Sequence, residues 1–120
     1  MGKFEKKMIE LGAIDTPIER LEIDEWFENV TIAFQGQENI GNVMCIFKQC
    51  YEVSLKHDVT YDKGKNSKGE LNYKYFIQDI HVEKYKEFLC FKISAWPLEG
   101  KILCKEISIE VNGNSEYIFK

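Results

Sequence analysis

The chain has 120 residues, of which 44% are hydrophobic and 13% aromatic, so it can bury a core without a metal or a disulfide. Its net charge of −4 and its single arginine, Arg20, disfavour nucleic-acid binding, which needs a basic surface and often uses arginine. No apolar run is long enough to cross a membrane, and the charged N-terminus does not resemble a secretory signal. We expect one cytoplasmic domain over residues 1–120.

Residues 1–13 predict a short helix. Phe4, Met8 and Leu11 recur at the spacing of one helical face, and Gly12 can cap the C-terminal end. Such a short helix is not stable alone in water, so we expect it to pack on the rest of the chain. Residues 17–120 then form a β-rich body.

Alternating apolar and polar residues predict the first strands of this body. The expected ranges are 18–24, 29–35, 42–48 and 51–59. In the last of these, the inward side chains are Tyr51, Val53, Leu55 and His57. A polar loop over 60–72, rich in lysine and glycine, follows.

A long hairpin is predicted over residues 73–96. Phe76, Ile80 and Val82 share one face of its first strand, and Leu89, Phe91, Ile93 and Ala95 share one face of its second.

The last part of the chain predicts a turn over 97–100 and a strand over 101–111. The apolar face of that strand changes side, which indicates a bulge near Lys105. Asn112-Gly113 predicts a tight hairpin turn into a final strand over 116–119.

These elements indicate a mainly β fold. Seven or eight strands with short connections favour an antiparallel meander that forms a two-layer sandwich or a curved half-barrel, with one short N-terminal helix.

The residues offer little support for catalysis. Asp79, His81 and Glu83 share one face of a strand, where they can be solvated charges or a general base and its partner. In an alternative interpretation, the chain is a small-ligand-binding or hydrolytic β-domain that uses His57, Asp79 and His81 as its site. No common catalytic or metal-ligand signature is present, so we expect no enzyme, no metal and no cofactor.

The four cysteines lack the paired spacing of a metal site. Their scattered positions are typical of small buried hydrophobic residues in a reducing compartment, and the four are Cys45, Cys50, Cys90 and Cys104.

An acidic run between residues 15 and 28 is the best candidate for a binding surface. An acidic surface with aromatic anchors suits a basic protein partner. The candidate partner-binding residues are Glu19, Glu22, Asp24, Glu25, Trp26 and Glu28. In the alternative interpretation, the glutamates are the wet face of an edge strand and Trp26 belongs to the core.

Three segments carry a resemblance to a known class of protein. They are NVMCIFKQCYEVSLKHD at 42–58, YFIQDIHV at 75–82 and ISAWPLEGKILCKEISIEV at 93–111. Together they resemble the small β-rich immunity-type proteins of bacterial polymorphic toxin systems, including the YxiG-like group. The resemblance implies a cytosolic protein that binds a toxin and has no catalytic activity.

Charge and resemblance together favour a monomer or weak homodimer that blocks a basic toxin domain. A structural or phage accessory protein that self-associates through a strand edge is a further alternative.

Overall fold

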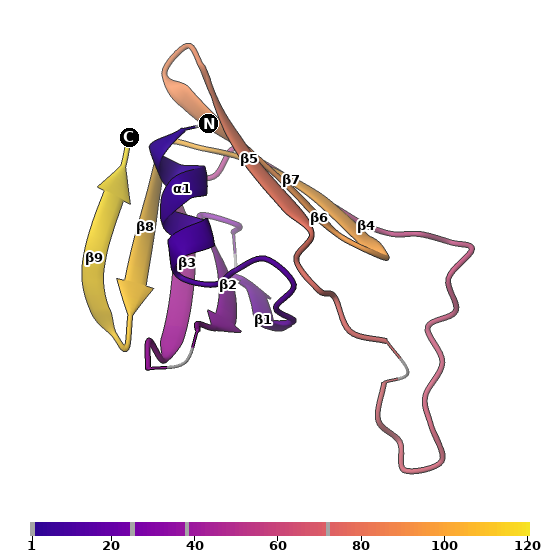
Figure 1. Cartoon of the computed structure of the whole chain (residues 1–120). Helices are drawn as coiled ribbons and strands as arrows, with labels where there is room; N and C mark the ends of the chain where they lie inside the picture. Colours follow the sequence, from indigo (N-terminus) through magenta and orange to yellow (C-terminus); the bar gives the residue numbers. More distant parts are fainter. Residues whose placement is uncertain (1, 25, 38, 72) are drawn as a thin grey trace.

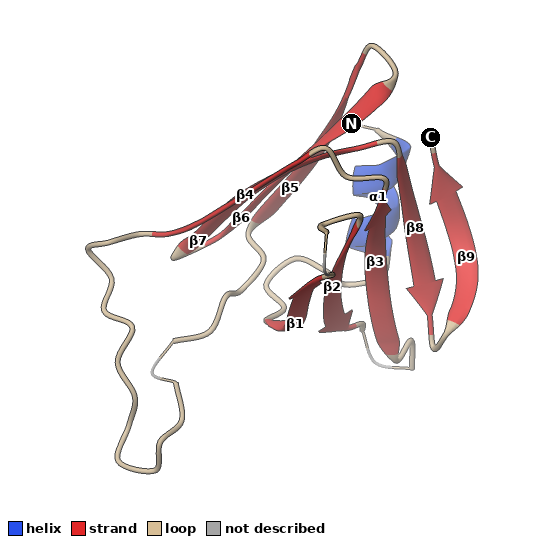
Figure 2. Cartoon of the chain, turned by 180° about the vertical axis from the view of Figure 1, so that it is seen from behind, coloured by secondary structure: helices blue, strands red, loops and turns tan. Residues whose placement is uncertain are grey.

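The computed structural model describes residues 2–24, 26–37, 39–71 and 73–120. These residues form one helix and nine strands in two antiparallel sheets (Figures 1 and 2), which confirms the predicted mainly β fold with an N-terminal helix. The first sheet has the strand order β1-β2-β3-β8-β9, and the second has the order β4-β7-β6-β5. The elements are α1 Lys3–Glu10, β1 Ile18–Ile23, β2 Asn29–Gln35, β3 Asn42–Lys48, β4 Glu52–His57, β5 Asp79–Tyr85, β6 Phe88–Ala95, β7 Leu98–Cys104, β8 Glu106–Val111 and β9 Asn114–Phe119.

A bent two-stranded ribbon connects the two sheets. β3 pairs with β8 in the first sheet, and the same two chain segments continue as β4 paired with β7 in the second. At the bend, the Lys105 N–H donates to the Lys48 carbonyl at 3.2 Å, and the Tyr51 N–H donates to the Leu103 carbonyl at 2.7 Å. The prediction of one bulged strand over 101–111 is therefore wrong. The apolar face changes side because the chain passes from one sheet to the other at Lys105.

The core lies between the inner faces of the two sheets. Phe47 of the first sheet and Phe91 of the second meet with ring centroids 4.5 Å apart. The inward face predicted for residues 89–95 is confirmed, because Leu89, Phe91, Ile93 and Ala95 are all buried.

The helix α1 packs on the inner face of the first sheet beside β5, an edge strand of the second (Figure 1). The Phe4 ring contacts the rings of Phe91 and Phe119 edge-on, and the Met8 sulfur lies 3.4 Å from the Cys45 sulfur. The predicted apolar stripe of the helix is thus confirmed, and the helix occupies the part of that inner face that the second sheet leaves uncovered.

The predicted start of the long hairpin and the predicted extent of the turn after it are wrong. Its first strand begins at Asp79, and the preceding residues bridge instead to the chain before β1 through the pair Pro17 and Phe76. Phe76 is 44% exposed, whereas Ile77 is fully buried, so the inward side chain at this point is Ile77. Its second strand is followed at once by β7, which starts at Leu98, inside the range expected to be a turn.

Other local predictions are confirmed. β2 and β3 have the predicted bounds, and Asn112 and Gly113 have the positive φ angles, 52° and 84°, of a tight hairpin turn.

The prediction that Tyr51 faces inward is wrong. Its side chain is exposed, because Tyr51 lies at the bend before β4 begins. Residues 58–71 and 73–78 contain no strand, and the middle of this loop extends away from the sheets before the chain returns at Phe76 and Ile77 (Figure 2). The one helix that the described residues form is too short to cross a membrane.

Candidate functional site

The acidic candidate residues lie along β1 and in the turn that joins it to β2. Asp24 fixes this turn: its N–H donates to the Asn29 carbonyl at 3.1 Å, and its Oδ2 accepts from the Asn29 N–H at 2.9 Å. The Phe27 N–H donates to the Asp24 carbonyl at 3.0 Å. These bonds hold the turn in one conformation, so side chains on it are presented in a defined arrangement.

Trp26 lies at this turn and is 80% exposed. The alternative interpretation is therefore wrong in placing Trp26 in the core. Its other part agrees with the structure, because β1 is an edge strand on which Glu19 and Glu22 are exposed. Trp26 lies between the end of β1 at Ile23 and the start of β2 at Asn29, outside both strands. An exposed side chain of this size on a fixed turn is a feature typical of binding surfaces.

The other acidic candidates do not all lie together. Glu22 is exposed on β1, and its Oε1 is 3.2 Å from the Arg20 Nε. Glu19 lies at the opposite end of β1, where the pairing with β2 is irregular between Ile18 and Arg20. Glu25 lies outside the described residues. We call Glu22, Asp24, Trp26 and Glu28 the acidic turn surface.

Cys50 lies beside the acidic turn, because its N–H donates to the Glu28 carbonyl at 3.1 Å. Its thiol is buried at the bend that follows β3, and burial is the main cause that raises its pKa to about 11. The negative charges of Asp24 and Glu28 add to this rise. The backbone contact places Glu28 where the chain passes from β3 to β4.

An apolar depression beside the turn was not predicted. It has a volume of about 290 Å³ and is lined by Ile23, Phe27, Val53 and Leu55. The alternation of β1 and β4 predicted that Ile23, Val53 and Leu55 face inward. It could not predict that the edges of two different sheets would bring them together.

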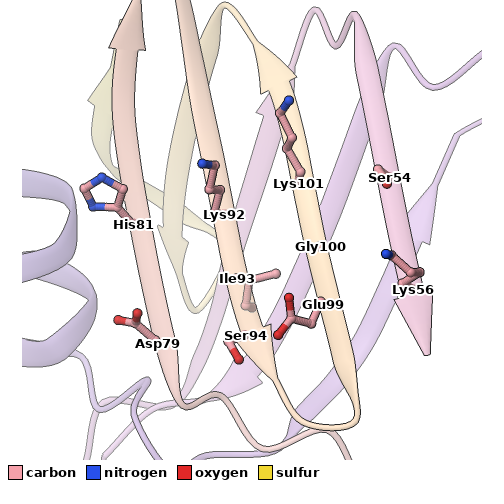
Figure 3. Close-up of a pocket in the computed structure, with 10 residues that line it drawn as sticks. All are labelled: Ser54, Lys56, Asp79, His81, Lys92, Ile93, Ser94, Glu99, Gly100 and Lys101. Carbon is pink, nitrogen blue, oxygen red and sulfur yellow. The ribbon is translucent and has the colours of Figure 1, made fainter. Parts of the chain in front are cut away.

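The alternative site, built on His57, Asp79 and His81, is not assembled. Asp79 and His81 line a depression of about 450 Å³ on the outer face of the second sheet, together with side chains of β4, β6 and β7 (Figure 3). Ser54 and Lys56 of β4 face this depression, so His57, the next residue along the strand, points to the other side.

His57 instead holds the base of the long loop. Its Nε2 is 2.8 Å from the Tyr61 carbonyl oxygen, which can only accept, so Nε2 carries a proton. Its Nδ1 is 2.8 Å from the Tyr75 hydroxyl. Burial, together with a hydrogen bond to Tyr73, raises the pKa of Tyr75 to about 12. With both ring nitrogens engaged, this histidine has a structural role.

His81 lies between two carboxylates on the edge strand β5. Its Nδ1 is 3.2 Å from Glu5 and its Nε2 is 3.0 Å from Glu83. The bond from His81 lowers the pKa of Glu83. Across the described ranges, no three side chains of the metal-binding types are grouped closely enough to hold an ion.

The cysteines are free thiols, and three of them, Cys45, Cys50 and Cys104, are buried. Burial raises the pKa of Cys45 and of Cys104 to about 12. The fourth, Cys90, is half-buried on the second sheet. The prediction that they act as small core residues is thus confirmed for the three buried thiols.

Comparison with known proteins identifies the family. The family model described as "Immunity protein PIM7" matches residues 2–111. No curated protein matches the sequence. The fold is similar to the crystal structure of an uncharacterized protein from Neisseria gonorrhoeae, with a TM-score of 0.61 and 15% identity over 81% of this chain and 91% of that one. The family match covers most of the chain and agrees with the resemblance to immunity-type proteins. The chain belongs to the PIM7 immunity protein family.

Proposed function

We propose that this immunity protein neutralises a basic toxin domain by binding it through the acidic turn surface. The observation that carries the proposal is Trp26, which is 80% exposed on a turn that is held by hydrogen bonds and that also bears Asp24 and Glu28. In this mechanism the protein covers a functional surface of the toxin and performs no chemistry on it. Glu25, which lies within the same turn segment of the sequence, is part of the proposed surface, and Glu19 is a peripheral contributor.

The two kinds of side chain have different roles in this proposal. Trp26 supplies a large apolar area that leaves water on binding, and tryptophan is enriched among residues that dominate interface energies. Glu22 and Glu28 supply negative charge, which speeds the encounter with a basic partner and orients it. The hydrogen-bonded turn lowers the entropic cost of binding because it is ordered beforehand.

The first experiment isolates the partner. The tagged chain is used to capture proteins from the source cells at low and at high salt, and the protein that copurifies in a stoichiometric ratio is retained. The proposal predicts a basic protein whose capture weakens as salt screens the charges.

The second experiment tests the surface with matched variants. Trp26→Ala is compared with Tyr85→Ala, which removes an exposed aromatic side chain from the end of β5, between Lys84 and Lys86 in the sequence. We expect the first change to raise Kd by roughly 30-fold or more, because truncating a hot-spot residue costs about 2 kcal/mol or more. The second change should leave Kd within about twofold, since most interface-remote surface changes are neutral.

Charge reversal tests the proposed steering. Glu28→Lys is compared with Glu116→Lys on β9, the strand at the far edge of the same sheet. The first change should lower the association rate at low salt by roughly tenfold and the second should not. Equal effects of the two changes would show that only the overall charge matters. Normal binding by both the Trp26 and the Glu28 variants would remove the proposed surface.

A further inference from the structure

We propose that the depression lined by Ile23, Phe27, Val53 and Leu55 is an anchor pocket. Its occupant is one apolar side chain of the partner, carried on a loop that also bears lysine or arginine. This inference rests on the proposed function, and it adds the place where the partner's own side chain is buried. We call these four residues the anchor pocket.

The size and lining of the depression suit one large side chain. All four lining residues are apolar, and the volume of about 290 Å³ lies just below the range of about 300–1,000 Å³ that is usual for small-molecule pockets. A pocket of this kind offers no charged group or metal that would bind a polar metabolite. Burial of a leucine or an aromatic ring is the interaction that it can stabilise.

The position of the pocket leaves it open to a partner. β1 and β4 are edge strands, one from each sheet, and the pocket lies between them. At the other edge of the second sheet, β5 is covered by α1, where Glu5 accepts a hydrogen bond from the Val82 N–H at 2.8 Å. The space between the sheets is therefore covered by the chain itself at β5, whereas at β4 it is lined by the half-buried side chains of Val53 and Leu55.

The residues of the pocket are held ready for an occupant. Ile23 and Phe27 are each 45% exposed, although both are large and apolar. Phe27 has a φ angle of 45°, a left-handed conformation that is uncommon for an aromatic residue and is maintained by the hydrogen bonds of the turn. A strained conformation that keeps an aromatic ring at the surface is a feature associated with functional sites.

The negative charge near the pocket favours an occupant carried on a basic loop. Asp24 and Glu28 lie at the two ends of the turn that carries Phe27, where the Phe27 N–H donates to the Asp24 carbonyl at 3.0 Å, and both acidic residues are exposed. Glu22 lies on the opposite face of β1 from Ile23 and adds only to the wider negative charge. The Cys50 N–H donates to the Glu28 carbonyl at 3.1 Å, so Glu28 lies beside the chain that leads into β4, where the other half of the pocket lies. A second copy of this chain would bring the same carboxylates against themselves. A basic loop would be attracted.

Defined peptides test the pocket without the toxin. The probe is a blocked peptide with one leucine between two pairs of lysines, titrated into isotope-labelled protein and followed by methyl NMR. We expect saturable shifts at the Ile23, Val53 and Leu55 methyl groups. Binding should weaken by about tenfold when glycine replaces the leucine, because the buried apolar area is lost. It should also weaken when glutamates replace the lysines.

Two variants with a matched control complete the test. Val53→Phe fills the pocket, and Ile23→Ala removes one wall from a half-exposed position that the fold tolerates. Ser54→Phe places the same ring on the opposite face of β4. The first two changes should abolish the methyl shifts with an otherwise native spectrum, and the control should preserve them.

The outcomes separate this inference from the proposed function. Shifts that survive Val53→Phe, that occur equally with the glycine peptide, or that appear only on the outer face of the second sheet would overturn the anchor pocket. Shifts that depend on protein concentration without peptide would assign the pocket to a second copy and overturn the basic occupant. If Val53→Phe leaves toxin binding unchanged while Trp26→Ala weakens it, the result supports the proposed function and contradicts the anchor pocket. If neither change affects toxin binding, the result contradicts both the proposed function and the anchor pocket.

Discussion

Asp24 and Asn29 exchange two hydrogen bonds across the β1–β2 turn, one from the Asp24 N–H at 3.1 Å and one to the Asp24 carboxylate at 2.9 Å. The carboxylate therefore has a structural task in addition to the charge that it contributes to the acidic turn surface. A single substitution of Asp24 can therefore change both the stability of the turn and the charge of the acidic turn surface.

The two contributions of Asp24 can be separated with alanine and asparagine. Asp24→Ala removes the acceptor for the Asn29 N–H and should lower the free energy of unfolding by about 1 kcal/mol, the usual net value of one hydrogen bond. Asp24→Asn keeps an acceptor oxygen, so its effect on stability should be smaller, while both variants lose the charge and associate more slowly with the toxin. Urea unfolding and association kinetics measure the two effects. Equal destabilisation by both variants would contradict the role of the hydrogen bond.

The buried carboxylate of Glu5 attaches α1 to the edge strand β5. It accepts from the Val82 N–H at 2.8 Å and lies 3.2 Å from the His81 Nδ1. Glu5→Ala leaves the Val82 N–H without that acceptor and should cost about 1–3 kcal/mol in the free energy of unfolding. Glu5→Gln retains an oxygen acceptor and should be milder. Glu10→Ala, an exposed change on the same helix, is the control, and a cost equal to that of Glu5→Ala would contradict the account.

The start of the long loop has an acid-sensitive contact. The Thr60 hydroxyl and the Thr60 N–H both donate to the Asp58 carboxylate, and these bonds lower its pKa from 3.8. Because the folded pKa is depressed, the contact stabilises the fold above pH 3.8 and this contribution is lost as the pH falls through the folded value. Thr60→Val should raise the pKa of Asp58 toward 3.8, as measured by NMR titration. An unchanged pKa in that variant would exclude the hydroxyl as the main cause.

The thiols should differ in reactivity. Burial raises the pKa of Cys45 and Cys104 to about 12, so almost none of their thiolate exists at neutral pH. We expect a disulfide reagent to modify half-buried Cys90 first and to reach the others only after unfolding. Cys90→Ser should remove the fast phase. A fast phase that persists in this variant would show that the core opens readily.

Much of the fold could be predicted where a strand has one buried face. β2 and β3 were located to the residue because their apolar side chains alternate without interruption. The same rule failed at Phe76, since alternation continues through a segment that bridges to Pro17 before β5 begins. It also failed at Lys105, where the change of face marks a passage between sheets that local periodicity cannot distinguish from a bulge.

The site was less predictable than the fold. The acidic run and Trp26 could be recognised from the sequence, because charge and aromatic content are visible there. The sequence left open whether Trp26 is buried in the core or exposed, and the structure shows that it is 80% exposed. The anchor pocket required the edge of one sheet to lie beside the edge of the other, a relation between β1 and β4 that no local pattern contains.

Hydrogen–deuterium exchange on the purified complex with the toxin would locate the binding surface. Binding through the acidic turn surface and the anchor pocket should slow exchange in the β1–β2 turn, residues 22–28, and in β4 at residues 53–55. Exchange at the β5–β6 turn and in β9 should stay as in the free protein. Protection confined to the outer face of the second sheet, around Lys92 and Lys101, with no change at residues 22–28, would contradict the acidic turn surface as the toxin-binding site.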